Sequence, residues 1–397
     1  MLERIRFVYA ISCVFNVYIV NAIYDMQTNI RLNNKRRMAC ALIIIAAVIL
    51  ASAGVGFARA EQCAVAAPVE CDTRASDPDL VRYDGKIEHI FTHELIFDTD
   101  KAFSPKNSLR DCFDKDHLTA KEFSALLDEL YKNDYVLIGL DTALSEKPLF
   151  IPRGKRPVVM SFDDMTYDTV GRGCIDKIIL SDGQICDYTA SAVPQITRER
   201  ENVTILESFI ASRPDFSFDG GRATICVNGY NGILGYRVTP DCRVSDAYMN
   251  KEIAACKELV RELKARGYSF ASHTYYHKYF DTTSAQTLEK DCAAWEKYIE
   301  PIVGDTETLC YPAGKHNAAS AKNGIFKKHG FKVFLCVGDF DGTEEERADV
   351  AARYVYRLPF DGTALRLYGK RYARMADVRA IYDSARFRPF SYKGFYH

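Results

Sequence analysis

Two short motifs place side chains that could do chemistry at the ends of apolar segments. Asp163 and Asp164 end one such segment, and His273 and His277 follow another. Adjacent carboxylates at the rim of a buried strand are costly unless a cation or a shared proton compensates their charge. Imidazoles four residues apart face the same side if the chain turns helical there, where one metal ion can bridge them. One carboxylate and two imidazoles together predict a zinc site of the catalytic type, with positions open for water and substrate.

Each motif alone has a simpler interpretation. An Asp-Asp pair at a strand end is more often a turn or a helix cap, and many His pairs are accidents of the surface. A third segment, Tyr311-Pro312-Ala313-Gly314, also follows an apolar run. Its backbone N–H groups could point toward the other two motifs, or it could be an ordinary turn between a strand and a helix.

The surrounding sequence predicts the elements that would bring the motifs together. From residue 89 onward, short apolar runs alternate with longer amphipathic ones. The short runs predict strands at 89–97, 135–140, 157–162, 224–227, 268–271, 308–311, 332–337 and 354–358. Strands separated by helix-length segments pair in parallel through right-handed crossovers. Roughly seven such units favour a closed or nearly closed β/α barrel, in which the loops after the strands carry the chemistry.

The longer runs predict the helices of this barrel. They are expected at 119–131, 203–211, 252–265, 285–302 and 319–329. Thr119 and Glu122 fit a capping box at the start of the first helix. A hairpin is expected at 175–186 around Asp182-Gly183, a pair that accepts the positive φ of a tight turn.

The three motifs, in this order, resemble those of a known family. Ser-Phe-Asp-Asp (161–164), His-Thr-x-x-His (273–277) and Tyr-Pro-x-Gly (311–314) are similar to the first three motifs of the polysaccharide deacetylases, the NodB-homology group of carbohydrate esterases. The resemblance covers about residues 85–372. It implies a distorted (β/α) barrel of the NodB type. It also implies a metal-dependent hydrolase that removes acetyl groups from an N-acetylated polysaccharide of the peptidoglycan or poly-N-acetylglucosamine type.

The resemblance assigns roles to individual residues. Asp163 would be the catalytic base, while Asp164, His273 and His277 would bind a divalent metal. Zinc suits two histidines and a carboxylate best, although Co²⁺, Ni²⁺ or Fe²⁺ could also bind. The third motif is expected to bind substrate at Tyr311, Pro312 and Ala313, and the backbone N–H of Ala313 is expected to hold the oxyanion.

Two positions depart from the family pattern. Cys310 stands where the family usually has an arginine that orients the base, and residues 356–361 lack the histidine that serves as general acid. Some relatives look circularly permuted and carry that histidine before the Asp-Asp motif, so His93 is the expected general acid. The alternative for His93 is a core histidine with satisfied hydrogen bonds. His89 points to the same face of the strand and is the second candidate.

A segment rich in glycine and tyrosine, 228–237, lies between the Asp and His motifs. Aromatic faces pack on pyranose rings, so this segment could be a sugar-stacking loop; an irregular structural loop is the alternative. Trp295, the only tryptophan, is expected in the core.

Charge distribution and hydropathy predict export. Residues 1–60 carry a net charge of +5 and the remainder −6, which argues against a nucleic-acid partner. A basic cluster at 35–37 precedes an uncharged apolar run at 38–58, long enough to cross a bilayer, and Ala58-Arg59-Ala60 has the form of a signal-peptidase site. The basic cluster should stay cytoplasmic, so the barrel would lie outside, anchored to the membrane or secreted, at a bacterial cell surface.

The expected organisation is a signal peptide or transmembrane anchor at 1–60, a linker at 61–84, the barrel at 85–372 and a C-terminal helix and tail at 373–397. Eleven of the thirteen cysteines follow residue 60. Pairs such as Cys174 with Cys186, or Cys226 with Cys242, could be disulfides in an exported protein, and free buried thiols are the alternative.

Two other functions fit the same residues. An O-acetyl esterase acting on a plant or wall glycan would use the same site. A catalytically inactive cell-wall carbohydrate-binding protein would explain the two departures from the family pattern, although a pure binder has little need of three metal ligands.

Overall fold

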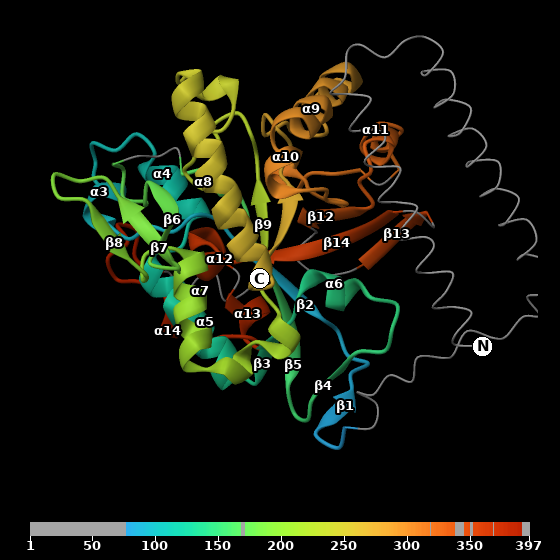
Figure 1. The fold of residues 1–397 in the computed structure, drawn as a ribbon. Helices are drawn as coiled ribbons and strands as arrows, with labels where there is room; N and C mark the ends of the chain where they lie inside the picture. The colour runs from blue at the N-terminus through green and yellow to red at the C-terminus, as the bar shows by residue number, and fades with distance from the viewer. Residues whose placement is uncertain are drawn as a thin grey trace, which may run out of the picture. The chain divides into compact units, whose positions relative to one another are not determined.

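Seven parallel strands close into a ring at the centre of the fold (Figure 1). The computed structural model describes residues 77–167, 171–317, 319–337, 345–349, 352–367 and 369–390. The ring strands, in order, are β2 (Glu88–Thr92), β5 (Arg156–Phe162), β9 (Thr224–Val227), β10 (Ser269–Ser272), β11 (Thr308–Cys310), β12 (Val333–Val337) and β14 (Ala352–Pro359). Because β14 pairs in parallel with both β12 and β2, the ring is closed. The predicted β/α barrel is confirmed.

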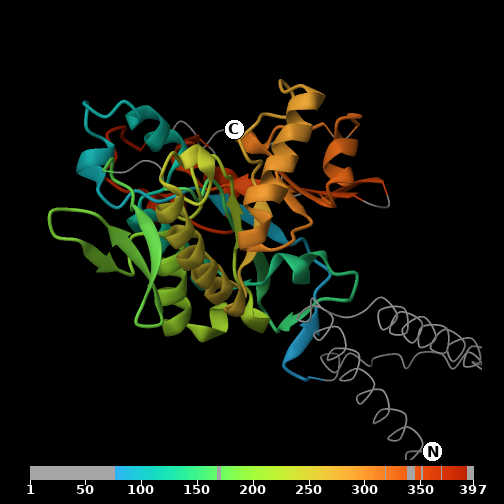
Figure 2. The ribbon, with the colours of Figure 1, turned by 45° about the horizontal axis from the view of Figure 1, so that its top comes forward.

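Helices lie around the outside of the ring (Figures 1 and 2). The longer ones are α5 (Ala120–Lys132), α7 (Asn202–Ser212), α8 (Asp246–Ala265) and α9 (Ala285–Tyr298). Shorter turns of helix are α3 (Thr99–Ala102), α4 (Arg110–Asp116), α6 (Leu140–Leu144), α10 (Glu300–Val303), α11 (Asn323–Lys328), α12 (Gly362–Leu367), α13 (Gly369–Tyr372) and α14 (Val378–Ile381). Single 3₁₀ turns are η2 (Pro214–Phe216), η3 (Phe218–Gly220), η4 (Pro240–Cys242) and η5 (Pro312–Gly314). The predicted capping box of α5 is present, with Thr119 and Glu122 each accepting the other's backbone N–H.

Three groups of strands lie outside the ring. β3 (Tyr135–Leu137) extends the sheet beside β5, and β13 (Glu345–Asp349) pairs antiparallel with β14. β1 (Leu80–Arg82) pairs with β4 (Phe150–Pro152), so a strand forms within the segment expected to be a linker. The third group is an antiparallel sheet of β6 (Lys177–Ser181), β7 (Gln184–Thr189) and β8 (Gln195–Thr197).

The predicted hairpin is confirmed and joins β6 to β7. Its two turn residues, Asp182 and Gly183, have φ values of 50° and 71°. Positive φ at both central residues matches the twist of the flanking strands, and Asp and Gly adopt it readily. The sequence pattern did not indicate the third strand, β8.

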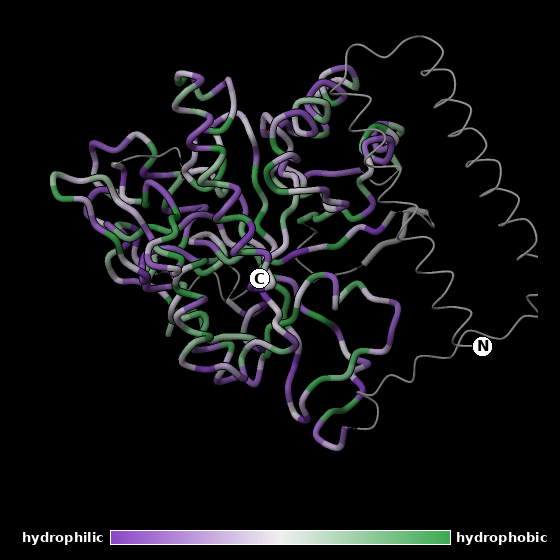
Figure 3. Tube along the Cα trace, viewed as in Figure 1, coloured by the Kyte–Doolittle hydropathy of each residue, from purple (hydrophilic) through white to green (hydrophobic). Residues whose placement is uncertain are grey.

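Alternation along the ring strands decides which side chains face its interior. Val158, Met160 and Phe162 of β5 pack into the large core beneath the helices, whereas Val159 belongs to the small cluster inside the ring. Figure 3 shows the apolar character of the central strands. Because side chains alternate along a strand, Ser161 and Asp163 share the inward face with Val159. The first motif therefore delivers Asp163 to the barrel interior.

Several predictions concern parts of the chain outside the ring. Residues 1–60, including the apolar run at 38–58, lie outside the described residues. Among the residues that the structure describes, no helix is long and apolar enough to cross a membrane. The cysteines at the two suggested disulfide positions are free thiols. Trp295 is buried, as predicted.

A buried ion cluster ties the C-terminal segment to the barrel. Arg386 follows α14, and its guanidinium binds both carboxylate oxygens of Glu122 at 2.7 Å and the carbonyl of Asp114 at 2.9 Å. Arg386 also lies 3.5 Å from the Asp114 carboxylate, and all three side chains are fully buried. Removing one member of such a cluster leaves the charges of the others buried without a partner in a medium of low dielectric.

We expect the substitution Arg386→Leu to lower the free energy of unfolding by about 3–5 kcal/mol, because it leaves Glu122 unpaired in the core. The matched control is Arg379→Leu, since Arg379 pairs with Asp377 at the surface with both side chains about half exposed. That exposed pair should contribute less than about 1 kcal/mol. Denaturant unfolding measures both values, and equal losses would contradict a special role for the buried cluster.

Candidate active site

The three motifs meet at one rim of the barrel. Asp163, His273 and Tyr311 each come one residue after a ring strand, β5, β10 and β11 respectively. Neighbouring strands hold these positions, since the Asp163 N–H donates to the Thr92 carbonyl and the His273 N–H to the Val227 carbonyl, both at 2.8 Å. The barrel therefore brings together residues that lie about 110 positions apart in the sequence.

Asp164, His273 and His277 form a group able to hold a metal ion. Asp164 Oδ1 lies 3.6 Å from His273 Nε2 and 3.5 Å from His277 Nε2. Asn228 donates to the same Asp164 oxygen at 2.8 Å, and His273 Nδ1 bonds to the Cys310 carbonyl at 3.0 Å. Outer hydrogen bonds of this kind fix the tautomer and orientation of metal ligands. This donor set of two imidazoles and one carboxylate could hold a divalent metal ion.

The two histidines lie on a turn, whereas their spacing was expected to bring them together on a helix. Thr274 and His277 have positive φ values of 57° and 51° and form a tight turn. Two further bonds hold this turn in place, because the Asp291 carboxylate of α9 accepts the N–H groups of Tyr275 and Tyr276 at 2.8 Å. Positive φ is strained for a β-branched residue such as Thr274, and such strain persists only where the surroundings impose it.

The electrostatics of the group favour a cation. Burial would raise the pKa of Asp164, but the two histidines outweigh it and lower the pKa. Burial would lower the pKa of His273, yet Cys310 and Asp164 raise it to about 10. The raised pKa of a buried imidazole means that its neighbours stabilise positive charge at this place. A metal ion bound there would replace the proton of His273, because histidine binds metal in its neutral form.

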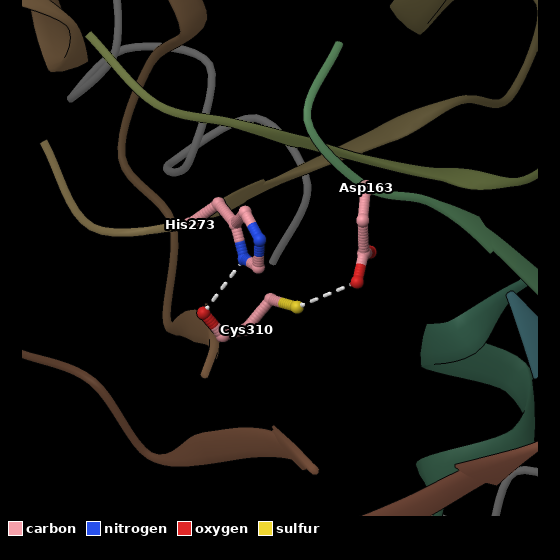
Figure 4. A group of neighbouring side chains, drawn as sticks. All are labelled: Asp163, His273 and Cys310. Atoms are coloured by element: carbon pink, nitrogen blue, oxygen red, sulfur yellow. Dashed lines mark hydrogen bonds between the residues drawn. The ribbon is translucent and has the colours of Figure 1, made fainter. Parts of the chain in front are cut away.

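A second group with metal-ligating atoms consists of Asp163, His273 and Cys310 (Figure 4), and it shares His273 with the first. Arg357 already occupies it. The guanidinium donates to Asp163 Oδ1 and Oδ2 at 2.8 Å each and lies 3.0 Å from Cys310 Sγ. Because a guanidinium repels a metal ion and already balances the carboxylate, we assign the second group to an ion pair.

Arg357 is the functional residue that sequence reasoning missed. It comes from β14, in the segment where the family's histidine is absent, and it supplies the guanidinium that Cys310 does not. Burial would raise the pKa of Asp163, but the charge and hydrogen bonds of Arg357 hold that pKa well below its ordinary value. The available signal was weak, because β14 carries two arginines, Arg353 and Arg357, on the face that Val355 turns toward the inside of the ring.

His93 lies beside this group, in the loop just after β2 rather than within the strand. Its Nδ1 bonds to the Asp116 carbonyl at 2.7 Å, and its side chain is partly exposed. The charge of His93 contributes to the lowered pKa of both Asp163 and Asp164, so this side chain lies near the site. Because the Asp116 carbonyl is bonded to Nδ1, Nε2 is the ring nitrogen left for proton transfer.

His89, the second candidate for the acid, does not suit that role. It is buried, and its Nε2 bonds to Ser161 Oγ at 3.1 Å. Burial and the positive charge of Arg357 keep its pKa well below the ordinary value, so the ring is neutral near pH 7.

The third motif lies at the rim of the barrel, but the ring of its tyrosine, Tyr311, is buried and not accessible to a ligand. Tyr311 is 0% exposed, packs against Phe280 and Phe334, and donates its hydroxyl to Asn323 at 2.9 Å. Pro312 is buried as well, whereas Ala313 is exposed and has a positive φ of 55°. The Tyr311 side chain is therefore closed to solvent, and only Ala313 of the three residues is exposed.

The segment 228–237 is mostly structural. Tyr236 is buried, with the Lys177 ammonium over its ring at 4.3 Å, so it cannot stack on a sugar. Gly232 has a positive φ of 89°, and a Cβ there would collide with the Tyr236 carbonyl. Tyr230 is partly buried, with its ring 6.4 Å from that of Tyr276. The geometry thus favours the structural interpretation of this loop.

We expect Asp164→Asn to weaken zinc binding by at least about 100-fold, because it removes the only carboxylate of the metal group. Isothermal titration of the metal-free protein with zinc measures the effect. Cys310→Ala is the control, since it belongs to the second group and its backbone carbonyl still orients His273. A large loss of zinc affinity in Cys310→Ala would instead place the metal in the second group, and would contradict the assignment to Asp164, His273 and His277.

Arg357→Lys keeps the positive charge but not the two-pronged contact with Asp163. Loss of a bidentate charged contact, worth about 1.5–3 kcal/mol, should reduce turnover about 10- to 100-fold. In the native protein the lowered pKa keeps Asp163 ionised even below the pH at which an ordinary carboxyl group takes up a proton. In the variant burial is less compensated, so the pKa rises and the acid limb of kcat/KM moves to higher pH. Arg374→Lys is the control, because Arg374 pairs with Glu88 at the other end of β2. This substitution should leave the pH profile of kcat/KM unchanged.

Residues 219–334 match the family model described as polysaccharide deacetylase. No curated protein matches the chain. Solved structures similar to the chain include a Streptococcus pyogenes deacetylase, PplD, in complex with acetate, at 14% identity over 70% of this chain and 93% of that chain with a TM-score of 0.42. IcaB from Ammonifex degensii has 13% identity over 71% and 94% with a TM-score of 0.40, and a de-N-acetylase from Aggregatibacter actinomycetemcomitans has 14% over 70% and 95% with 0.40.

Similarities as low as these to solved structures support no conclusion about function. The family match, however, covers both histidines and the Tyr-Pro-x-Gly motif, so the predicted resemblance is confirmed for that part of the barrel. Residues 219–334 are therefore similar to the polysaccharide deacetylases, and this similarity includes the His and Tyr-Pro-x-Gly motifs but not the Asp-Asp motif.

Proposed function

We propose that this protein is a metal-dependent deacetylase of an N-acetylated polysaccharide, working outside the cytoplasm. The observation that carries the proposal is the meeting of two charged groups at one barrel rim: the metal-binding group of Asp164, His273 and His277, and the adjacent ion pair of Asp163 with Arg357. His273 lies between the two, because its ring is within reach of both Asp164 and Asp163. The family match supports the same chemistry.

Asp164, His273 and His277 would hold the metal. A divalent ion bound there supplies a Lewis acid that polarises the acetyl carbonyl and makes water more acidic. Zinc is the ion that two imidazoles and one carboxylate suit best, and Co²⁺, Ni²⁺ or Fe²⁺ are the alternatives.

Asp163 is the proton acceptor in this mechanism. Arg357 keeps its carboxylate ionised and fixed, so an acceptor always stands beside the metal group. The lowered pKa makes Asp163 a weaker base than an ordinary carboxylate. The fixed position of the carboxylate offsets this loss of basicity, because the proton acceptor is already in place when the reaction begins.

His93 is the proton donor, and the third motif stabilises the developing negative charge. The Asp116 carbonyl holds His93 Nδ1, so the protonated ring presents Nε2–H to the departing amine. The exposed backbone at Ala313 offers its N–H to the oxyanion. The products are acetate and a free amino sugar.

The substrate is a polymer of the peptidoglycan or poly-N-acetylglucosamine type, and the basic and apolar segments of residues 1–60 support an extracytoplasmic location. A protein anchored in a bacterial membrane, or secreted across it, would meet such a polymer outside the cytoplasm. A nucleic acid is not a partner in this proposal.

The decisive test is release of acetate from N-acetylglucosamine oligomers with added zinc and with a chelator. His93→Ala should lower kcat about 10²- to 10⁴-fold, the usual contribution of a general acid. His329→Gln is the control, because His329 pairs with Glu289 and Glu296 outside the ring. No acetate from any acetylated glycan in the metal-loaded protein would refute the enzyme, and faster release from an O-acetylated xylan would favour an esterase.

A further inference from the structure

A buried carboxylate on α9 is bonded to the turn that carries two of the proposed metal ligands. Asp291 is 1% exposed, although aspartates are almost never fully buried unless their charge is compensated. Burial raises its pKa to about 6, because the N–H groups of Tyr276 and Tyr275 and the charge of Lys278 offset the loss of water only in part. The carboxylate is therefore ionised at neutral pH although burial disfavours its charge, and the proposed chemistry does not use it.

Asp291 binds the middle of the turn between the two histidines. Each carboxylate oxygen accepts one backbone N–H at 2.8 Å, Oδ1 from Tyr275 and Oδ2 from Tyr276. The residues on either side of this pair, Thr274 and His277, have positive φ values. Hydrogen bonds to an ionised group are stronger than those between neutral groups, so they can hold a turn that would otherwise be strained.

The same turn is bonded to the loop that orients the third ligand. The Tyr275 carbonyl accepts the N–H groups of Gly229 at 2.9 Å and Tyr230 at 3.0 Å. The preceding residue, Asn228, donates its side-chain amide to Asp164 at 2.8 Å. The turn and the loop are in close contact, because a Cβ at Gly229 would lie 2.3 Å from the Tyr275 ring. The backbone of Tyr275 thus joins α9 to the loop after β9.

We propose that Asp291 is a positioning residue for all three metal ligands, acting on two through the turn that it binds and on one through the Tyr275 backbone and Asn228. The inference rests on the metal site of the proposed function. Ligands that are fixed before an ion arrives lose little conformational freedom when it binds, so pre-positioning raises affinity. Removing the carboxylate should therefore weaken metal binding, although Asp291 is bonded to residues between the ligands rather than to the ligands themselves.

The substitution Asp291→Asn tests the turn in the metal-free full chain. Asn keeps the size of the side chain, but only one of its two polar atoms can accept an N–H. Loss of one such bond should speed hydrogen exchange of the Tyr275 and Tyr276 amides about 5- to 10-fold, which mass spectrometry of peptides covering 273–278 measures. Unchanged exchange there would overturn the role of Asp291 in holding the turn.

The matched control is Asp187→Asn. Asp187 is 0% exposed, and burial raises its pKa to about 6 as well. It also accepts two consecutive backbone N–H groups, those of Glu199 at 3.0 Å and Arg200 at 2.9 Å. These residues precede α7, so Asp187→Asn should speed exchange around 199–200 and leave peptides covering 273–278 unchanged.

Zinc affinity of the full chain, measured by isothermal titration calorimetry, tests the effect on the ligands. It should fall about 10-fold in Asp291→Asn and stay within about threefold in Asp187→Asn. Asp291→Glu, which keeps the charge and both acceptor oxygens, should lose less affinity than Asp291→Asn. The visible absorption of bound Co²⁺, which depends on ligand geometry, should change in Asp291→Asn but not in Asp187→Asn.

Two outcomes would overturn the positioning role. One is unchanged zinc affinity and an unchanged Co²⁺ spectrum in Asp291→Asn. The other is an equal loss of affinity in Asp187→Asn, since affinity would then follow the stability of the fold alone. Failure of the proposed function gives a different result: a native chain that binds zinc but releases no acetate from any acetylated glycan would refute the deacetylase and leave the role of Asp291 standing.

Discussion

The ion pair between Arg357 and Asp163 sets the charge inside the barrel. A carboxylate buried without a partner costs several kcal/mol, so a barrel with Asp163 on its inner face requires a cation there. Arg357 provides one from β14, while Asp163 follows β5, and both strands pair with β2 but not with each other in the described sheet. The pair thus spans one strand of the ring. Ser161 and the ring of Phe91 complete the surroundings of the guanidinium, at 2.8 Å and 4.2 Å.

That constraint explains how two adjacent aspartates do different things. In a continued strand Asp164 would point away from the interior, on the face opposite Asp163. Its positive φ of 57° ends the strand and turns the carboxylate toward His273 and His277. Aspartate tolerates this conformation better than most residues. One side chain is therefore committed to Arg357, and the next is available to a metal.

Sequence periodicity predicted the ring, the helices and the hairpin because those features depend on local patterns of apolar residues and turn-forming pairs. The common rim of the motifs followed from a general property of β/α barrels. Arg357 could not be found this way, since its partner lies 194 residues away across the ring. The burial of the Tyr311 ring could not be predicted for a related reason: the motif gives its position after a strand, but only packing against Phe280 and Phe334 shows that its ring is buried.

Burial divides the site into an inner and an outer part. The inner part, Asp163, Arg357 and His273, is sealed from solvent, and any change there leaves a buried charge unpaired. The outer part, Asp164 and His277, is partly open to solvent. A molecule from solvent can therefore reach the metal-binding group while the ion pair of Asp163 with Arg357 stays buried behind it.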